Sequence, residues 1–529
     1  RATLLLPWFL AVAWLAPTWV WAVPHPAVFE AGPARVSTSH PASREIDRLT
    51  FEQHRACGLQ TANLCSDAVF LRRVYLDVIG TLPTGSEAQA FLESQTPDKR
   101  RQLVDQLLER DEYVDYWTMK WCDLLRVKAE FPINLWPNAV QAYHRYLHDS
   151  VKLNKPGHLF ARELLTASGS NFRVGQVNFY RALQSREPRD IAQTVALIFL
   201  GERADSWPPE RRDGLAGFFA QVGYKSTQEW KEEIVYFDPA RDTHRLAAAA
   251  RFPDGSRPRL TGNRDHRELF ADWLLDPNHP AFARNMANPV WSWLLGRGII
   301  HQPDYIRPDN PPSHPALLEH LRGEWGRSGY DFKHLVRIIL NSTTYQLSCI
   351  PKTDTPEAAA QIAHYPLRRL EAEVLIDALN QLTGSRDSYS SLIPEPFTFI
   401  PDDQRAIALP DGSITSSFLE LFGRSPRDTG LESERNLQIT AGQCLHLLNS
   451  SQLQRKLESS PMIRFQTSGN KPPRQIARGL YLGVLSRLPT PDEFAVVEQT
   501  FPLGKTGHRE ATIDLAWALL NSPEFLYRH

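Results

Sequence analysis

The chain has 529 residues, of which 42% are hydrophobic and 22% are charged, so it is long enough to bury a large core and to form two or more globular domains. Lysine and arginine together number 59 and aspartate and glutamate 60, which gives a formal net charge of -1. This balance excludes a global field that would draw the protein to nucleic acid or to an anionic membrane.

The N-terminus predicts an export signal. Residues 4–16 form an apolar run, and Val20-Trp21-Ala22 places small residues where a signal peptidase would cut after Ala22. An uncleaved anchor is the alternative, but prolines interrupt a stretch barely long enough to span a bilayer. We expect a signal peptide at 1–22, a flexible segment at 23–42, and a soluble extracytoplasmic protein, periplasmic or secreted, with no later membrane span.

Export would place the cysteines in an oxidising compartment. Cys57 and Cys65 lie close together in the sequence, which predicts a disulfide that closes a small loop. A metal pair is the alternative, but no further Cys or His ligand lies nearby. Cys122, Cys349 and Cys444 are isolated in or beside apolar helical patterns and are expected to be free thiols.

Most of the chain predicts helix. In the segment 70–79, apolar residues recur at helical spacing, and Gly80-Thr81-Leu82-Pro83-Thr84 ends that helix. Thr84 and Glu87 then form a capping-box pattern, in which the threonine accepts from a free backbone N–H and the glutamate reaches back. The next helix is therefore predicted to begin directly after Thr84.

The same unit recurs at 478–490, where Thr490 and Glu493 repeat the cap. Both copies run into a helix that ends in a Leu-Leu pair, at 107–108 and 519–520, and 339–345 forms a weaker third ending. The sequence thus predicts helical hairpins with an internal helix-turn-helix duplication that serves structure. Asp77 of the first copy is matched by Gly483 in the second, so the duplicated scaffold does not require an acid there.

Two regions depart from this pattern. Residues that favour strands, together with Asp-Pro and Asp-Gly turn signals between 233 and 256, predict a short β-hairpin and a linker, which we place at 241–262. The linker separates a helical domain at 43–240 from a second at 263–529. From Leu392 to Pro426, prolines disfavour helix and predict a long ordered loop, a kind that is often functional. The predicted fold class is mainly α.

His144 and His148 are four positions apart on a predicted helix, so they would face the same side and could share a metal ion. A catalytic zinc normally needs three protein ligands, and no third is evident. Ordinary surface histidines are the favoured interpretation, and no metal is expected. The chain also lacks a nucleotide-binding glycine loop, a His-Glu-x-x-His motif and a Gly-x-Ser-x-Gly motif.

The densest polar cluster lies in the loop 423–436, which leads into a helix capped by Thr440 and Gln443. A buried ion network, an anion or sugar site, and acid–base catalysis are the three interpretations. A charge-paired structural loop is favoured, because such networks also occur without catalysis. The catalytic candidates are Asp428, Glu432 and Glu434, the ligand-binding candidates are Arg424, Arg427 and Arg435, and Arg405, Asp411 and Ser413 are expected to face the same site.

A second, weaker candidate combines aromatic and acidic residues, which together suit contact with a carbohydrate. Its members are Trp207, Trp230, Glu232 and Glu233. The edge of a packed core explains these residues equally well.

Short motifs along the chain carry a family resemblance. In the first half they are the run 70–80, Trp117 and Trp121 before 123–126, and 162–167; in the second half they are 268–274, 295–298, 311–315 and 368–373. By these motifs the chain resembles the secreted planctomycete-type proteins built from domains of unknown function 1549, often called cytochrome-C-associated, and 1553.

The resemblance assigns domain 1549 to residues 43–240 and domain 1553 to residues 263–529. The segment 192–207 resembles the place where relatives usually carry a haem-attachment Cys-x-x-Cys-His, but it contains neither cysteine nor histidine. We expect no covalently attached haem and no other cofactor.

These observations predict an exported binding or assembly component of an extracytoplasmic system that handles polysaccharide. A carbohydrate is the expected ligand and other exported proteins are the expected partners; the link to polysaccharide is an analogy with the family. A carboxylate-based hydrolase centred on 424–435 is the alternative. A haem-associated redox protein is least favoured, because the attachment motif is missing.

Overall fold

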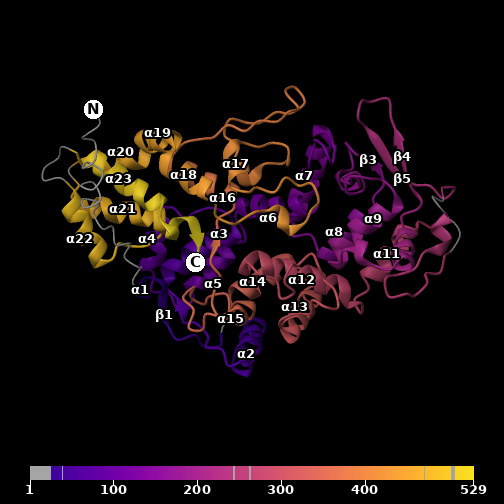
Figure 1. Ribbon diagram of the computed structural model, residues 1–529, viewed down its shortest axis with the longest axis horizontal. Helices are drawn as coiled ribbons and strands as arrows, with labels where there is room; N and C mark the ends of the chain where they lie inside the picture. Colours follow the sequence, from indigo (N-terminus) through magenta and orange to yellow (C-terminus); the bar gives the residue numbers. More distant parts are fainter. Residues whose placement is uncertain (1–25, 38–39, 242–244, 261–263, 470, 502–506) are drawn as a thin grey trace, which may run out of the picture.

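The structure, a computed structural model, describes residues 26–529 except 38–39, 242–244, 261–263, 470 and 502–506 (Figure 1). The mainly α fold class is confirmed, since strands are few and short beside the helices. The predicted signal peptide at 1–22 lies outside the described residues. Over the described ranges, no helix combines the length and the apolar character needed to cross a membrane.

The first half of the chain is a series of helices joined by turns. They are α1 (Pro26–Phe29), α2 (Pro41–Ala56), α3 (Asp67–Val78), α4 (Gly85–Glu93), α5 (Lys99–Leu107), α6 (Asp111–Leu124), α7 (Pro137–Lys152), α8 (Gly157–Thr166), α9 (Pro188–Val195) and α10 (Pro209–Ala216). The segment predicted to be flexible, 23–42, contains α1, β1 and the first residues of α2, whereas residues 33–37 form neither helix nor strand. Phe29 packs against the core, and β1 (Glu30–Gly32) pairs with β2 (Leu64–Cys65).

The second half continues this helical pattern. Its helices are α11 (His266–Leu274), α12 (Pro280–Leu295), α13 (Pro315–Arg327), α14 (Phe332–Leu340), α15 (Pro356–Ala360), α16 (Ala372–Thr383), α17 (Ser417–Leu421), α18 (Ala441–Asn449), α19 (Ser451–Ser459), α20 (Pro461–Thr467), α21 (Pro473–Leu485), α22 (Pro491–Thr500), α23 (His508–Leu520) and α24 (Pro523–Leu526). The last of these is followed by β7 (Tyr527–Arg528), which pairs antiparallel with β6 (Arg368–Arg369). The end of the chain thus lies against the start of α16.

The β-hairpin lies earlier in the chain than its predicted place at 241–262. It consists of β4 (Val222–Ser226) and β5 (Glu233–Phe237), and β3 (Gly169–Ser170) pairs with the other edge of β5. In the described part of 241–262 there is a short 3-10 turn, Ala247–Ala249, and no strand. Strand β5 falls within the stretch 233–256 that carried the prediction, but β4 and the turn that joins it to β5 lie before that stretch and were not predicted.

The two copies of the duplicated unit, α3–α4 and α21–α22, lie side by side. Both predicted capping boxes are present, at Thr84 with Glu87 and at Thr490 with Glu493. A Cβ on Gly85 would lie only 3.7 Å from the backbone nitrogen of Gly483, so α4 and α21 approach closely there. A Cβ on Gly483, the counterpart of Asp77, would meet only the sulfur of Met462 within 4 Å, at an ordinary 3.7 Å, so it is Gly85 that lies against the neighbouring helix.

One hydrophobic core runs through both halves of the chain. At its centre, Trp117 and Trp121 of α6 contact Trp293 of α12 with ring centroids 5.8 and 5.7 Å apart. Phe332 of α14 contacts Trp121 at 5.4 Å. The helices of the first and second halves of the chain therefore bury their apolar faces against one another and share one core.

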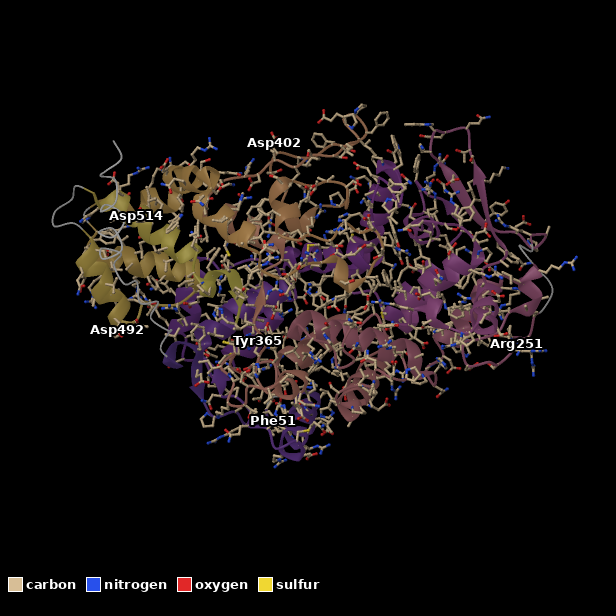
Figure 2. All side chains as sticks on the ribbon, in the orientation of Figure 1. Phe51, Arg251, Tyr365, Asp402, Asp492 and Asp514 are labelled. Atoms are coloured by element: carbon tan, nitrogen blue, oxygen red, sulfur yellow. The ribbon has the colours of Figure 1, made fainter. Side chains whose placement is uncertain are left out.

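The region predicted as a long loop, Leu392–Pro426, crosses the outer edge of the molecule, where Figure 2 labels Asp402. Its proline-containing stretch 393–401 forms no regular helix, as predicted. Helix α17 and the 3-10 turn η6 (Ala406–Ala408) do form within it. Asp377 of α16 anchors the turn, because its carboxylate accepts the backbone N–H groups of Ala406 and Ile407 at 2.8 and 3.1 Å.

The predicted disulfide between Cys57 and Cys65 is absent, and both residues are free thiols. Cys65 lies in β2 opposite Glu30 and is buried in the core. Cys57 forms the C-cap of α2, where its sulfur lies 3.5 Å from Nε2 of Gln53. Pairing of β2 with β1 holds the thiol of Cys65 in the core, and the C-cap of α2 holds that of Cys57 near the surface. The short separation of the two cysteines in the sequence therefore does not lead to a disulfide.

Candidate functional site

The polar loop 423–436 connects α17 to α18 and contains the 3-10 turn η7 (Glu432–Glu434). Its course depends on left-handed backbone at Gly423 and Gly430. A Cβ would lie 2.2 Å from the carbonyl oxygen of Asn436 at the first position and 2.5 Å from that of Leu124 at the second. The approach at Gly423 thus brings the two ends of the loop together, and the approach at Gly430 brings its middle against the C-terminal end of α6.

The three arginines of the loop are paired by carboxylates that lie elsewhere in the chain. Arg427 Nε lies 2.9 Å from Oδ1 of Asp123, and Arg435 Nη2 lies 2.6 Å from Oδ2 of the same residue. Arg435 also binds Glu373 of α16 at 2.6 Å, and Arg424 Nε lies 3.5 Å from Glu373. Asp123 and Glu373 therefore join α6, α16 and the loop in one ion network.

The loop's own carboxylates do not serve these arginines. Asp428 forms an ion pair with Lys128 at 2.6 Å. Glu434 Oε1 accepts the backbone N–H groups of Asp428 and Thr429 at 3.1 and 2.6 Å and the Thr429 hydroxyl at 2.8 Å, so it braces the turn. The idea that Asp428, Glu432 and Glu434 pair Arg424, Arg427 and Arg435 is not borne out by these contacts.

Glu432 differs from the other two acids. Its Oε1 lies 3.3 Å from the hydroxyl of Ser292 in α12, and its backbone N–H donates to Asp304 at 3.2 Å. Neighbouring protein atoms shield the carboxyl group although the residue keeps exposed surface, and this desolvation, with the negative charge of Asp304, raises the pKa of Glu432 to about 7. A carboxyl whose pKa is raised in this way suits proton transfer near neutral pH.

This shift predicts how Glu432→Gln changes stability with pH. The folded pKa of about 7 lies above the value of about 4.3 expected in the unfolded chain, so the stability that the protonated group contributes is complete below that lower value and falls as pH rises towards 7. We expect the melting temperature of Glu432→Gln to exceed that of the parent increasingly between pH 5 and pH 8. Glu420→Gln, at an exposed position of α17, is the matched control; parallel melting curves for the parent and Glu432→Gln would contradict the prediction.

Of the three residues expected beside the loop, two are there. Asp411 accepts the backbone N–H groups of Ala129 and Ser413 at 2.9 and 2.8 Å, and its own carbonyl accepts from Arg424 at 3.0 Å. The Ser413 hydroxyl accepts from the backbone of Glu130 at 3.0 Å. Arg405 instead lies 3.8 Å from Asp377 of α16.

A second ion network, centred on Asp77, was not predicted. Asp77 accepts the hydroxyls of Tyr345 and Tyr365 at 2.8 and 2.9 Å, and it lies 2.9 Å from Arg368 and 3.4 Å from Arg528. Arg528 continues to Glu371 at 2.5 Å, and Lys120 lies 3.5 Å from that carboxylate. Figure 2 labels Tyr365 in the middle of the molecule. The sequence feature that could have pointed to this network is Asp77 itself, because the second copy of the duplicated unit has Gly483 at the same place.

The tryptophans of the second candidate site lie in different surroundings. Trp207 is buried, its ring nitrogen donates to Glu202 at 3.0 Å, and Arg211 stacks on it at 3.6 Å. Trp230 is 61% exposed in the turn between β4 and β5. Glu232 accepts from Ser170 and Thr227, and Glu233 pairs with Arg181 at 2.8 Å, so both acids stabilise the hairpin.

Trp230 belongs to an exposed aromatic cluster that joins three distant segments. Its ring lies 4.5 Å from that of Trp136 at the start of α7 and 5.8 Å from that of Phe397 in the long loop, and Trp136 lies 5.3 Å from Phe397. Lys231 Nζ lies 5.6 and 5.7 Å from the two tryptophan rings. We call Trp136, Trp230 and Phe397 the aromatic cluster. Sequence reasoning found Trp230 but neither of its two partners.

Glu130 fixes the long loop beside this cluster. Its Oε1 accepts the backbone N–H of Leu392 and the hydroxyl of Ser391, each at 3.0 Å. Leu392 and Phe131, on either side of that contact, both expose their side chains. The apolar surface around the cluster is thus held in place by hydrogen bonds and is not a chance feature of a free loop.

His144 and His148 do face the same side of α7, with ring centroids 6.1 Å apart. His148 lies 3.6 Å from Asp115, while burial lowers the pKa of His144 to about 3. Within the described residues, no group of three or more His, Cys, Asp or Glu side chains could hold a metal ion. The histidine pair therefore gains no third ligand from the fold.

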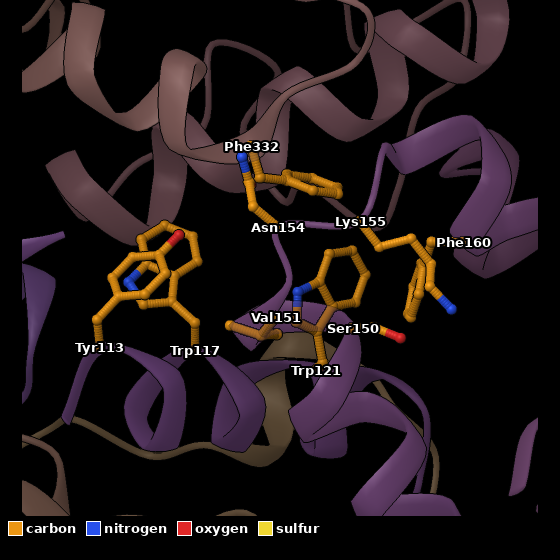
Figure 3. A pocket seen from close by; sticks show the side chains of 9 residues that line it. All are labelled: Tyr113, Trp117, Trp121, Ser150, Val151, Asn154, Lys155, Phe160 and Phe332. Carbon is orange, nitrogen blue, oxygen red and sulfur yellow. The ribbon is translucent and has the colours of Figure 1, made fainter. Parts of the chain in front are cut away.

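A small hollow, partly open to solvent, lies between α6, α7, α8 and α14 (Figure 3). Its walls are mostly aromatic and include Trp117, Trp121 and Phe332. The polar groups at its rim are already engaged: Asn154 donates to Asp331 at 2.7 Å and Lys155 donates to Glu163 at 2.5 Å. Neither Asn154 nor Lys155 is therefore free to orient a ligand in the hollow.

The segment 192–207 is a packing element between the halves. It forms the end of α9, a π-helical turn at Ala196–Leu200 and a 3-10 turn at Ala204–Ser206. Asn285 of α12 donates to the carbonyl of Ile198 at 2.9 Å, and the backbone N–H of Ile306 donates to the carbonyl of Gly201 at 2.7 Å.

Comparison with known families gives two matches. Residues 45–205 match PSCyt2, a protein of unknown function (DUF1549), and residues 266–501 match PSD1, a protein of unknown function (DUF1553). No curated protein and no solved structure matches the chain.

Proposed function

We propose that this chain, which belongs to the proteins that combine domains of unknown function 1549 and 1553, is an exported binding or assembly component that contacts carbohydrate through its aromatic cluster. Other exported proteins of the same system are the partners that an assembly role implies. The extracytoplasmic location, periplasmic or secreted, rests on the export signal at 1–22 and on the family resemblance.

The exposure of Trp230 and Phe397 is the observation that carries this proposal. Trp230 is 61% and Phe397 47% exposed, although large aromatic side chains bury well when a core is available. Their rings and that of Trp136 meet at steep angles of 60° to 72°, so they form a corner with accessible faces. A sugar ring can pack its C–H groups on such a face while Lys231 at the edge binds hydroxyls.

The contacts of the loop 424–435 support a binding component more than a hydrolase. Each of its arginines is engaged by an ion pair, Asp428 is held by Lys128 and Glu434 braces the turn. These contacts are what a structural role requires, because they consume the groups that a substrate would need.

Trp230→Ala is expected to weaken binding to insoluble polysaccharides by about tenfold, the effect of losing on the order of 1.4 kcal/mol at the centre of an interface. Sedimentation of the protein with a panel of purified polysaccharides measures this. The matched control is Phe465→Ala, because Phe465 is equally exposed, lies in α20 and also carries a lysine, Lys471, 3.6 Å from its ring. Failure of the parent to bind any polysaccharide, or an equal loss in both variants, would refute the proposal.

A further inference from the structure

Arg126 stands apart from the other buried arginines around the polar loop. It directly follows α6, adopts a left-handed backbone with φ of 56° and is 7% exposed. Its Nε is enclosed and has no hydrogen-bond partner. Its terminal nitrogens are not among the enclosed atoms, and no contact with a described residue engages them, so they are available to a ligand that enters from solvent. Arg424, Arg427 and Arg435, by contrast, each reach a carboxylate.

A second buried polar group next to Arg126 is also unpartnered. The hydroxyl of Tyr143 in α7 is enclosed and has no hydrogen-bond partner, and Tyr143 and Glu434 are the ionisable groups that act on Arg126. Among the described residues no ion pair joins Glu434 to the guanidinium: its Oε1 accepts three hydrogen bonds from Asp428 and Thr429, and its Oε2 accepts one from Ser425 at 3.4 Å. Burial lowers the pKa of Arg126 to about 10, so the side chain still carries its charge at neutral pH.

An unpaired buried cation is costly, and native proteins rarely keep one without a partner. The loop holds this one in place, since a Cβ on Gly430 would lie 3.3 Å from Cγ of Arg126. A guanidinium presents a rigid fork of donors that matches two oxygens of a carboxylate or phosphate group, and a tyrosine hydroxyl adds a further donor.

We propose that Arg126 and Tyr143 form a binding site for a small oxyanion, at the junction of α6, α7 and the loop 423–436. The ligand chemistry is a carboxylate or phosphate group with two oxygens available to the guanidinium fork. A free inorganic ion and the acidic group of a charged sugar share this chemistry. The site is independent of the aromatic cluster and of the carbohydrate proposal.

The test is titration of the exported protein with inorganic phosphate and, separately, with glucuronate, at constant ionic strength, by calorimetry and thermal unfolding. We expect the melting temperature of the parent to rise with the concentration of at least one of them, as mass action requires of a ligand that binds the folded state. A response to phosphate alone identifies a free ion as the ligand, and a response to glucuronate alone identifies an acidic sugar.

Arg126→Met is expected to lose this response and to weaken binding by about tenfold to a hundredfold, the effect of losing a charge-assisted contact. Without the anion it should melt no earlier than the parent, because the substitution removes an unpaired buried charge. Arg126→Lys keeps the charge but not the fork of donors, so it should bind the anion more weakly than the parent. This variant tests the proposal if Arg126→Met does not fold. Arg173→Met, at a position 78% exposed, is the control and should respond like the parent.

Two results would overturn the proposal: a parent protein whose melting temperature and calorimetric trace respond to neither probe, or an Arg126→Lys variant that binds as tightly as the parent. The first result would mean that Arg126 is solvated by water alone, and the second that the anion does not bind through the guanidinium fork. Because neither readout involves polysaccharide, failure here leaves the carbohydrate proposal intact, and failure of the Trp230→Ala test leaves this one intact.

Discussion

Asp77→Ala is expected to lower the free energy of unfolding by about 3 to 5 kcal/mol, the usual cost of removing one partner from a buried ion pair. Asp77 is fully buried and faces both Arg368 and Arg528, so its loss leaves two cations with reduced compensation. It also leaves the hydroxyls of Tyr345 and Tyr365 without their acceptor. Urea unfolding followed by tryptophan fluorescence measures the change.

The control for Asp77→Ala is Asp98→Ala, which removes the exposed acid paired with Arg101. Exposed pairs contribute between about 0 and 1 kcal/mol, so this variant should unfold almost with the parent. Should Asp77→Ala fail to fold, Asp77→Asn keeps an acceptor for the tyrosines and is expected to give a smaller loss in the same direction. Equal midpoints for Asp77→Ala and Asp98→Ala would show that the network stabilises nothing.

The contacts of Asp77 show that the two copies of the duplicated unit have different roles. The first copy of the unit contributes the acid, while β6 and β7 deliver Arg368 and Arg528 from the second half of the chain. The second copy packs on the first through Gly483 and Gly85, and the main-chain carbonyl of Val484 accepts from Arg72 at 2.7 Å. One copy thus provides charge and the other provides close contact, and both join the two halves of the chain.

Features that depend on a few neighbouring residues could be predicted from the sequence. The capping boxes at Thr84 and Thr490 and the loss of helix at 393–401 follow from side-chain and proline chemistry within about four positions, and each was confirmed. The mainly α fold class follows from the same local signals summed over the chain.

Features that depend on partners far apart in sequence could not be predicted in the same way. The polar loop was correctly singled out as a dense cluster of charge, but the carboxylates that pair its arginines, Asp123 and Glu373, lie more than fifty residues away. Trp230 was a candidate, whereas Trp136 and Phe397 carry no local pattern that marks them as its neighbours. The free state of Cys57 and Cys65 has a similar cause. Cys65 is held in β2 by pairing with β1, and α2 separates these two strands in the sequence.

Glu373→Gln is expected to destabilise the protein by about 3 to 5 kcal/mol, whereas Asp428→Asn should change its stability by less than about 1 kcal/mol. The Glu373 side chain is 1% exposed and binds both Arg424 and Arg435. Neutralising it leaves Arg424 without the carboxylate it contacts and leaves Arg435 to share Asp123 with Arg427. The Asp428 side chain is 32% exposed and meets only Lys128, so water replaces the lost pair at little cost.

The two variants differ from the parent by the same chemical change, an acid replaced by its amide, and both residues belong to the surroundings of the loop 423–436. Thermal unfolding of the two proteins beside the parent therefore isolates the effect of burial. A Glu373→Gln protein that melts with the parent would mean that the arginines are solvated and that the loop is an open site. A strongly destabilised Asp428→Asn would mean that the carboxylate of Asp428 supports the loop in a way its single contact does not show. We expect the melting temperature of Glu373→Gln to lie far below that of Asp428→Asn, because the ion network through Glu373 and Asp123 is what holds the loop against α16 and α6.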